Sequence, residues 1–166
     1  MLEKTKQYAI GCHDRVNQKY GNKPYSFHLN MVYEVAQEFS CLIPKEELEN
    51  TYCGCWVHDL IEDARETYND VLYNTNKTIA ELAYALTNEK GRTRIERAND
   101  RYYQGIRETP NATFIKLCDR IANVRHSKTK GSTMLDKYRK ENTDFAKKLY
   151  RPDLQEMFDH LEELFK

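Results

Sequence analysis

Residues 56–64, which read Trp-Val-His-Asp-Leu-Ile-Glu-Asp-Ala, decide how this chain is interpreted. Four groups that can bind a cation or accept a proton lie close together there: His58, Asp59, Glu62 and Asp63. Because residues three and four apart share one face of a helix, all four can lie on one side. Carboxylates this close repel one another unless a cation or a proton lies among them. The segment predicts a metal site on a helix; the alternative is a core histidine beside solvated surface charge.

The composition is typical of a folded protein with no membrane segment. Of 166 residues, 40% are hydrophobic and 31% are charged, and no apolar run approaches the ~18 residues of a spanning helix. The N-terminal residues MLEKTKQYAIG lack the features of a signal peptide. Without a secretory signal, the five cysteines indicate a reduced, cytoplasmic protein.

The charge balance bears on the partners of the protein. The chain carries 26 Lys and Arg against 26 Asp and Glu, so its net charge is zero. A nucleic-acid-binding protein normally shows a basic surplus, and we therefore expect no stable nucleic-acid partner. A small anionic substrate needs only local positive charge and stays possible.

Helical spacing of apolar residues recurs along the whole chain, while the alternation typical of strands is nearly absent. Thr67 and Asp70 resemble a capping box at the start of one short helix. We therefore predict a single all-α domain over residues 1–166. Helices are expected at about 3–19, 26–40, 45–64, 69–75, 79–88, 93–108, 112–126, 132–150 and 153–165.

Two further segments place chemistry-bearing residues among core-type neighbours. His28 begins an apolar helix after Lys-Pro-Tyr-Ser-Phe. Asp119 lies within the apolar face of residues 114–125, and a buried carboxylate needs a cation or a donor. Asn123 is one helical turn further on and points into the same space.

Along the chain, His28, the pair His58-Asp59 and Asp119 resemble the H…HD…D signature of the HD-domain metal-dependent phosphohydrolases. They are most similar to the (p)ppGpp-hydrolase domain of the RelA/SpoT family and its small single-domain relatives. Those relatives show Gly-x-Pro-Tyr-x-x-His, His-Asp-x-x-Glu-Asp and Lys-Leu-x-Asp-Arg-x-x-Asn-x-Arg; this chain matches at 21–28, with one extra residue, at 58–63 and at 116–125. The resemblance covers about 12–128 and implies a compact HD-domain helical bundle, in which about 132–166 are packing helices.

The resemblance implies one divalent metal ion, which in this family is usually manganese. Its ligands would be His28, His58, Asp59 and Asp119. Two imidazoles and two carboxylates without a thiolate suit Mn²⁺ or a similar ion with open positions for water and substrate. By the same resemblance, the pair that orients or activates the attacking water is Glu62 and Asp63.

Substrate contacts are also expected from the resemblance and from charge. Asn123 matches a residue that contacts the substrate ribose. Further candidates for contacts with the nucleotide are Tyr25 and the basic residues Lys19, Lys23, Lys116 and Arg120. The basic loop 90–94 is another candidate, and its alternative is an ordinary charged loop.

Two features depart from the family pattern or duplicate it. Relatives carry a guanine-stacking arginine upstream of Gly-x-Pro-Tyr, whereas this chain has Gln18 or Lys19 there, and neither offers a planar guanidinium. The identity of the base is therefore open. The second His-Asp pair, His13-Asp14, lacks a following Glu-Asp, and we expect it at the surface or behind the site.

These observations predict an enzyme, a metal-dependent nucleotide phosphohydrolase. The resemblance implies that it removes the 3′-pyrophosphate of (p)ppGpp by attack of a metal-activated water. The alternative is an HD-type phosphatase on another nucleotide, such as a deoxynucleotide, the 2′-phosphate of NADPH or another signalling nucleotide. A third hypothesis is a non-catalytic nucleotide sensor, which the intact Glu62-Asp63 pair disfavours. The oligomeric state is open.

Overall fold

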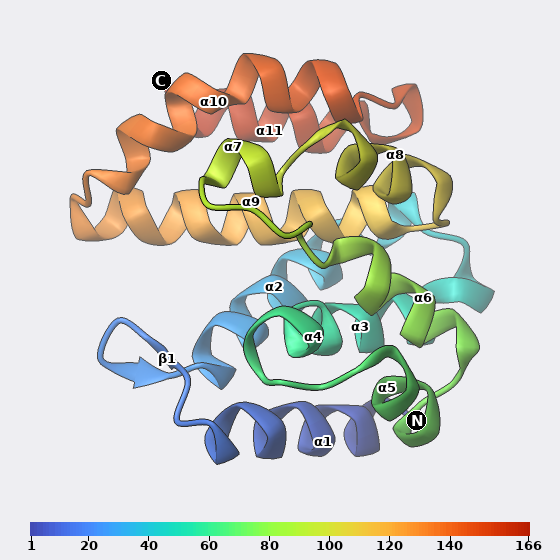
Figure 1. The fold of residues 1–166 in the computed structure, drawn as a ribbon. Coiled ribbons are helices and arrows are strands. Elements are labelled where there is room, and N and C mark those ends of the chain that lie inside the picture. The colour runs from blue at the N-terminus through green and yellow to red at the C-terminus, as the bar shows by residue number, and fades with distance from the viewer.

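The computed structural model describes residues 1–166, and nearly all its regular structure is helical (Figure 1). This confirms the all-α prediction. Three short 3₁₀ turns cover Ser40–Leu42, Lys45–Glu47 and Pro152–Leu154. The helices are α1 (Leu2–Arg15), α2 (Ser26–Glu38), α3 (Leu48–Val57), α4 (Leu60–Asp63), α5 (Tyr68–Asn74), α6 (Lys77–Leu86), α7 (Arg94–Arg97), α8 (Asp100–Glu108), α9 (Ala112–Lys130), α10 (Met134–Leu149) and α11 (Gln155–Leu164).

A small hairpin follows α1, where the sequence predicted helix to residue 19. Strands β1 (Lys19–Tyr20) and β2 (Lys23–Pro24) pair antiparallel, with Tyr20 opposite Lys23. Gly21 in the two-residue turn has a φ of +62°, which glycine adopts without a steric penalty. The hairpin places Tyr20 beside the start of α2.

Two predicted helices are each divided in the structure. The helix expected at 45–64 breaks between α3 and α4, at His58 and Asp59. The helix expected at 93–108 breaks before α8, because the Asn99 side chain accepts a hydrogen bond from the backbone N–H of Tyr102 and caps a new helix. The capping box of Thr67 and Asp70 is present at the start of α5, as predicted.

The helices form two sides with a middle layer between them. Figure 1 shows α1 along one side and α9, α10 and α11 along the other, with α2, α3 and α4 between. Helix α2 packs against both α9 and α3, and α1 packs against α3. Helices α10 and α11 pack on α9. Helices from distant parts of the sequence therefore meet where α2, α3 and α9 converge.

Two apolar clusters fill this arrangement, and the middle helices contribute to both. From α2, Val35 belongs to the cluster beneath α9 and Leu29 to the cluster above α1. From α3, Cys55 belongs to the cluster that contains α9 residues and Trp56 to the cluster that contains α1 residues. The C-terminal helices contribute to the first cluster, including Phe145, Met157 and Leu161. The assignment of 1–166 to one domain with a motif core at about 12–128 stays a prediction.

Helix α3 packs closely on side chains of both α9 and α6 at Gly54. A Cβ on Gly54 would lie 2.5 Å from Ile115 Cδ1 and 3.0 Å from Leu82 Cδ1. This close packing places the end of α3 against α9, where the candidate site lies. None of the helices combines the length and the hydropathy needed to cross a bilayer.

Candidate active site

Three segments bring the predicted ligands together. His28 lies in the first turn of α2, Asp119 lies in the middle of α9, and His58 and Asp59 lie at the break between α3 and α4. In a regular helix, neighbouring side chains diverge by about 100°. The break, where Asp59 has φ −105° and ψ 4°, lets His58 and Asp59 face the same point. The prediction of one continuous helix over 45–64 missed this break between α3 and α4.

The donor atoms of the four residues converge. His28, His58 and Asp119 each offer one atom, and these atoms lie within 4.8 Å of one another. The Nε2 atom of His28 is 3.3 Å from Asp119 Oδ1. The Asp59 Oδ2 atom is 3.0 Å from His58 Nε2 and 3.8 Å from His28 Nε2. The spacing indicates a place where the two imidazoles and the Asp119 carboxylate can share one cation, with the Asp59 carboxylate beside them.

Hydrogen bonds from outside the cluster orient three of the four donor residues, His58, Asp59 and Asp119. The Nδ1 atom of His58 lies 2.8 Å from the carbonyl oxygen of Cys55 and donates to it, so the lone pair of the neutral imidazole would lie on Nε2. The Tyr25 hydroxyl donates to Asp59 Oδ2 at 2.5 Å. Lys116 Nζ donates to Asp119 Oδ2 at 2.9 Å. These contacts hold the donor atoms without occupying His58 Nε2.

The chemistry of this donor set fits a divalent metal ion. His58 Nε2 is buried and makes no hydrogen bond, although a carboxylate oxygen lies 3.0 Å away. Burial opposes charge on His58, but the charges of Asp59 and Asp119 prevail and raise the pKa of His58 to about 9. A proton on His58 and a metal ion are thus two ways to neutralise the same carboxylates. The neutral imidazole that a metal needs would be produced by losing that proton.

Glu62 and Asp63 lie beside the cluster on α4, and both line a cavity. Glu62 accepts from Asn88 Nδ2 at 2.9 Å on each oxygen and from the Asn88 backbone N–H at 3.3 Å. Burial, followed by the charges of Asp59 and Glu62, raises the pKa of Asp63 to about 6. The structure therefore brings these two predicted proton acceptors to the donor cluster.

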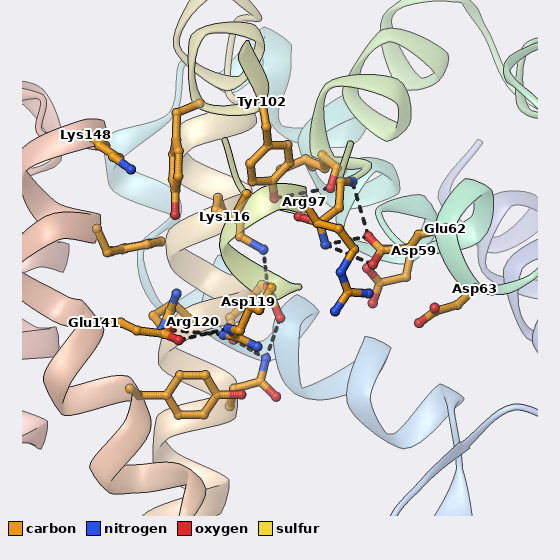
Figure 2. Close-up of a pocket in the computed structure, with 18 of the residues that line it drawn as sticks. Asp59, Glu62, Asp63, Arg97, Tyr102, Lys116, Asp119, Arg120, Glu141 and Lys148 are labelled. Atoms are coloured by element: carbon orange, nitrogen blue, oxygen red, sulfur yellow. Dashed lines mark hydrogen bonds and ion pairs between the residues drawn. The ribbon is translucent and has the colours of Figure 1, made fainter. Parts of the chain in front are cut away.

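The cavity holds about 450 Å³, within the range of small-molecule sites. Figure 2 shows Asp59, Glu62 and Asp63 on one side of it and Arg120, Glu141 and Lys148 on the other. Two further basic residues, Arg97 and Lys116, lie between these sides (Figure 2). An acidic wall that can bind a cation thus faces a basic wall that can bind phosphates.

The basic wall is ordered by one shared carboxylate. Glu141 on α10 accepts from Arg94 Nη2 at 3.1 Å and from Arg120 Nη1 at 3.0 Å. The guanidinium of Arg120 also lies over the ring of Phe145, 4.4 Å from its centroid. Because one carboxylate balances two guanidiniums, a net positive charge remains at this wall.

Only some of the predicted substrate-contact residues line the cavity. Tyr25, Lys116, Arg120 and Asn123 line the cavity. Lys19 and Lys23 are exposed and do not line it, and the Lys23 ammonium lies over the ring of Phe27 instead. They belong to the outer hairpin, whose turn points them into solvent. Of the basic loop 90–94, only Arg94 lines the cavity.

His13 was expected either at the surface or behind the site, and the structure places it behind the site. Its side chain is 0% exposed, and its ring lies 4.4 Å from that of Tyr25, behind the donor cluster. Burial lowers the pKa of His13 to about 4. Tyr102 and Tyr103 are buried against neighbouring helices, although both reach the cavity wall.

Several cavity residues were missed by sequence reasoning. Arg97 lies one turn after Arg94 on α7, so helical spacing from the basic loop could have found it. Tyr20, Tyr138 and Lys148 also line the cavity. No sequence signal pointed to them, because their proximity depends on how the hairpin and α10 pack.

Comparisons with known proteins agree with the resemblance that the motifs carry. No family model matches the chain. A mouse (Mus musculus) protein, guanosine-3′,5′-bis(diphosphate) 3′-pyrophosphohydrolase MESH1, is 28% identical over 69 residues, which are 42% of this chain and 38% of the mouse protein. A solved metazoan ortholog of SpoT, described as hydrolysing ppGpp and acting in starvation responses, has a TM-score of 0.71 at 21% identity. That match covers 98% of this chain and 93% of the solved chain, and it shows that the two share a fold.

Proposed function

We propose that this protein is a metal-dependent hydrolase that removes the 3′-pyrophosphate of (p)ppGpp. The observation that carries the proposal is the cluster of His28, His58 and Asp119 donor atoms within 4.8 Å, on the wall of a 450 Å³ cavity. The matches to MESH1 and to the SpoT ortholog support the same substrate class. A small nucleotide is therefore the partner that we assign to the cavity.

The metal ion would be held by His28, His58, Asp59 and Asp119, and we propose Mn²⁺. Two imidazoles and two carboxylates suit this ion, and no thiolate takes part. When bound, it would lower the pKa of a water molecule and stabilise charge that develops at phosphorus. Tyr25, Lys116 and Asn123 would keep the two carboxylates in place through the hydrogen bonds that they donate.

The other residues divide between proton transfer and binding. Glu62 and Asp63 would orient the attacking water and accept its proton. The water oxygen forms a bond to the phosphorus on the sugar 3′-oxygen, the bond to that oxygen breaks, and the 3′-oxygen takes up a proton. Arg94, Arg97 and Lys148 would bind phosphate oxygens across the cavity.

A second nucleotide class stays open because of one contact. Gln18, one of the two residues that can occupy the position where relatives carry a stacking arginine, donates to Asp63 Oδ2 at 3.4 Å. The Gln18 amide is thus directed to the Asp63 carboxylate. Glutamine also lacks the planar guanidinium with which an arginine stacks on guanine. This favours testing deoxynucleotides and NADPH beside ppGpp. Four of the five free cysteines are buried, and a reducing compartment, the cytoplasm, is the location that we propose.

The test is hydrolysis of ppGpp by the purified protein with Mn²⁺, with products separated by anion exchange. We expect GDP and pyrophosphate from the wild type. Glu62→Gln should lower kcat by about 10²- to 10⁴-fold while calorimetry shows unchanged Mn²⁺ binding. The matched control is Glu34→Gln, because Glu34 also accepts from an asparagine amide, Asn30 Nδ2 at 2.7 Å, but does not line the cavity.

Each outcome decides between the candidates. Intact ppGpp with the wild type would refute this substrate, and cleavage of a deoxynucleotide or NADPH in the same assay would assign the second class. Full activity of Glu62→Gln would remove Glu62 from the mechanism. Tight nucleotide binding with no hydrolysis of any substrate would favour the sensor hypothesis.

A further inference from the structure

Tyr20 is the cavity residue that the β1–β2 hairpin contributes. Its ring stacks on the imidazole of His28, with centroids 4.9 Å apart and an interplanar angle of 12°. Its hydroxyl donates to Asn123 Oδ1 at 2.7 Å. The hairpin therefore places a phenolic ring against the donor cluster and its oxygen on the asparagine that the motif assigns to the ribose.

The amide of Asn123 is already engaged by the protein. Its Nδ2 group donates to the carbonyl oxygen of Asp119 at 3.0 Å and to Asp119 Oδ1 at 2.6 Å. An asparagine amide has two N–H donors, so Asn123 keeps none for a ligand. The Tyr20 hydroxyl oxygen, by contrast, can accept a hydrogen bond while it donates to Asn123.

We propose that Tyr20 recognises the sugar hydroxyl next to the scissile phosphate and selects ribonucleotides over deoxyribonucleotides. The reacting phosphate must lie at the cluster that includes His28, and Tyr20 stacks directly on that ring. Because the 2′ and 3′ carbons of ribose are bonded to each other, the neighbouring hydroxyl then lies beside the phenolic oxygen. That hydroxyl donates to Tyr20, which donates to Asn123, in a chain of two hydrogen bonds.

The inference rests on the proposed function and narrows its substrate class. It holds for a 3′-pyrophosphate, whose free neighbour is the 2′-hydroxyl, and equally for a 2′-phosphate, whose neighbour is the 3′-hydroxyl. It disfavours 2′-deoxynucleotides, which offer no hydroxyl to donate to the phenolic oxygen in the complex.

The test is a cycle of two enzymes and two substrates. Wild type and Tyr20→Phe are each assayed on ppGpp and on its 2′-deoxy analogue. Loss of one neutral hydrogen bond should lower kcat/KM about three- to tenfold, through KM rather than kcat. We expect this loss when either the enzyme hydroxyl or the substrate hydroxyl is removed, and little further loss when both are absent.

The variant keeps the ring, so it should keep the stacking on His28 and bind Mn²⁺ as the wild type does. Tyr150→Phe is the matched control, because Tyr150 donates to an amide oxygen, Gln155 Oε1, at 2.6 Å outside the cavity. It should not alter the preference for the ribose substrate. An unchanged preference in Tyr20→Phe, or losses that simply add, would overturn the inference.

Failure of the proposed function gives a different result. If the wild type leaves ppGpp intact, the same cycle is measured by calorimetry with guanosine 3′-monophosphate and its 2′-deoxy counterpart, in the presence of Mn²⁺. A preference for the ribonucleotide that is lost in Tyr20→Phe would support the role of Tyr20 alone. Equal affinity for both nucleotides, or binding of neither, would overturn it.

Discussion

The hydrogen bond from Tyr25 to Asp59 offers a sharp test of the donor cluster. Tyr25 is 8% exposed, and its hydroxyl donates to Asp59 Oδ2 at 2.5 Å. The same oxygen lies 3.0 Å from His58 Nε2. In Tyr25→Phe, the carboxylate loses the group that holds this oxygen toward the imidazole, while the ring and its packing remain.

Two effects of this substitution can be separated. Loss of a hydrogen bond to a charged group should lower the free energy of unfolding of the metal-free protein by about 1.5–3 kcal/mol. Loss of a group that orients a metal ligand should weaken metal binding by about 10- to 100-fold, which corresponds to about 1.4–2.7 kcal/mol. The first effect reports the bond itself, and the second reports the use of Asp59 as a ligand.

Tyr8→Phe is the matched control. Tyr8 also donates to a carboxylate, Glu66 Oε2, at 2.6 Å, and neither residue lines the cavity. Urea unfolding with EDTA should show that both variants are destabilised. Calorimetric titration of Mn²⁺ into metal-free protein should show weaker binding in Tyr25→Phe alone.

The reasoning would be refuted by wild-type Mn²⁺ affinity in Tyr25→Phe alongside the expected loss of stability. Equal weakening of Mn²⁺ binding in Tyr8→Phe would also refute it, because the effect would then come from general destabilisation. Absence of any Mn²⁺ binding by the wild type would remove this ion from the site, and the same titration with other divalent ions would follow.

Three further predictions concern the pH dependence of stability, the basic wall and the core. Because burial lowers the pKa of His13 to about 4, the unfolded chain binds a proton below about pH 6.5 that the folded chain does not. Stability should thus fall as the pH drops, and urea unfolding of the metal-free protein should show His13→Phe losing about 2 kcal/mol less than the wild type between pH 7 and pH 5. Arg97→Gln should raise KM for ppGpp about tenfold or more, whereas Lys19→Gln, outside the cavity, should leave KM unchanged. A raised KM in Lys19→Gln and an unchanged KM in Arg97→Gln would refute the assignment of phosphate binding to the basic wall. Gly54→Ala should cost about 1–3 kcal/mol in thermal or urea unfolding because its Cβ would overlap Ile115, whereas Gly11→Ala, with nothing within 4 Å, should be neutral or stabilising.

Much of the candidate site could be predicted from sequence because its signals are local. His58, Asp59, Glu62 and Asp63 lie within one short segment, and one helical turn separates Asp119 from Asn123. Helical spacing is set by backbone geometry, so it shows which of these side chains share a face. The same reasoning predicted the capping box of Thr67 and Asp70, which the structure confirms.

The basic wall shows where local signals end. Lys19 and Lys23 are close in sequence to His28, yet they point into solvent, whereas Lys148 is far along the chain and lines the cavity. Proximity in sequence cannot rank such residues, because the packing of α10 on α9 decides which side chains reach the cavity. Tyr20 became a cavity residue only through a hairpin that the helical pattern did not predict.

The sequence by itself determined the all-α class, because helical periodicity is a property of short segments. It indicated the candidate ligands and the pair of carboxylates beside them through short motifs and the family resemblance that these motifs carry. Tertiary structure alone decided that His58 and Asp59 lie at a break between helices and so face one point. It also decided that His13 is buried behind the cluster. Both depend on how distant helices exclude water from one another, and no local pattern encodes that free energy.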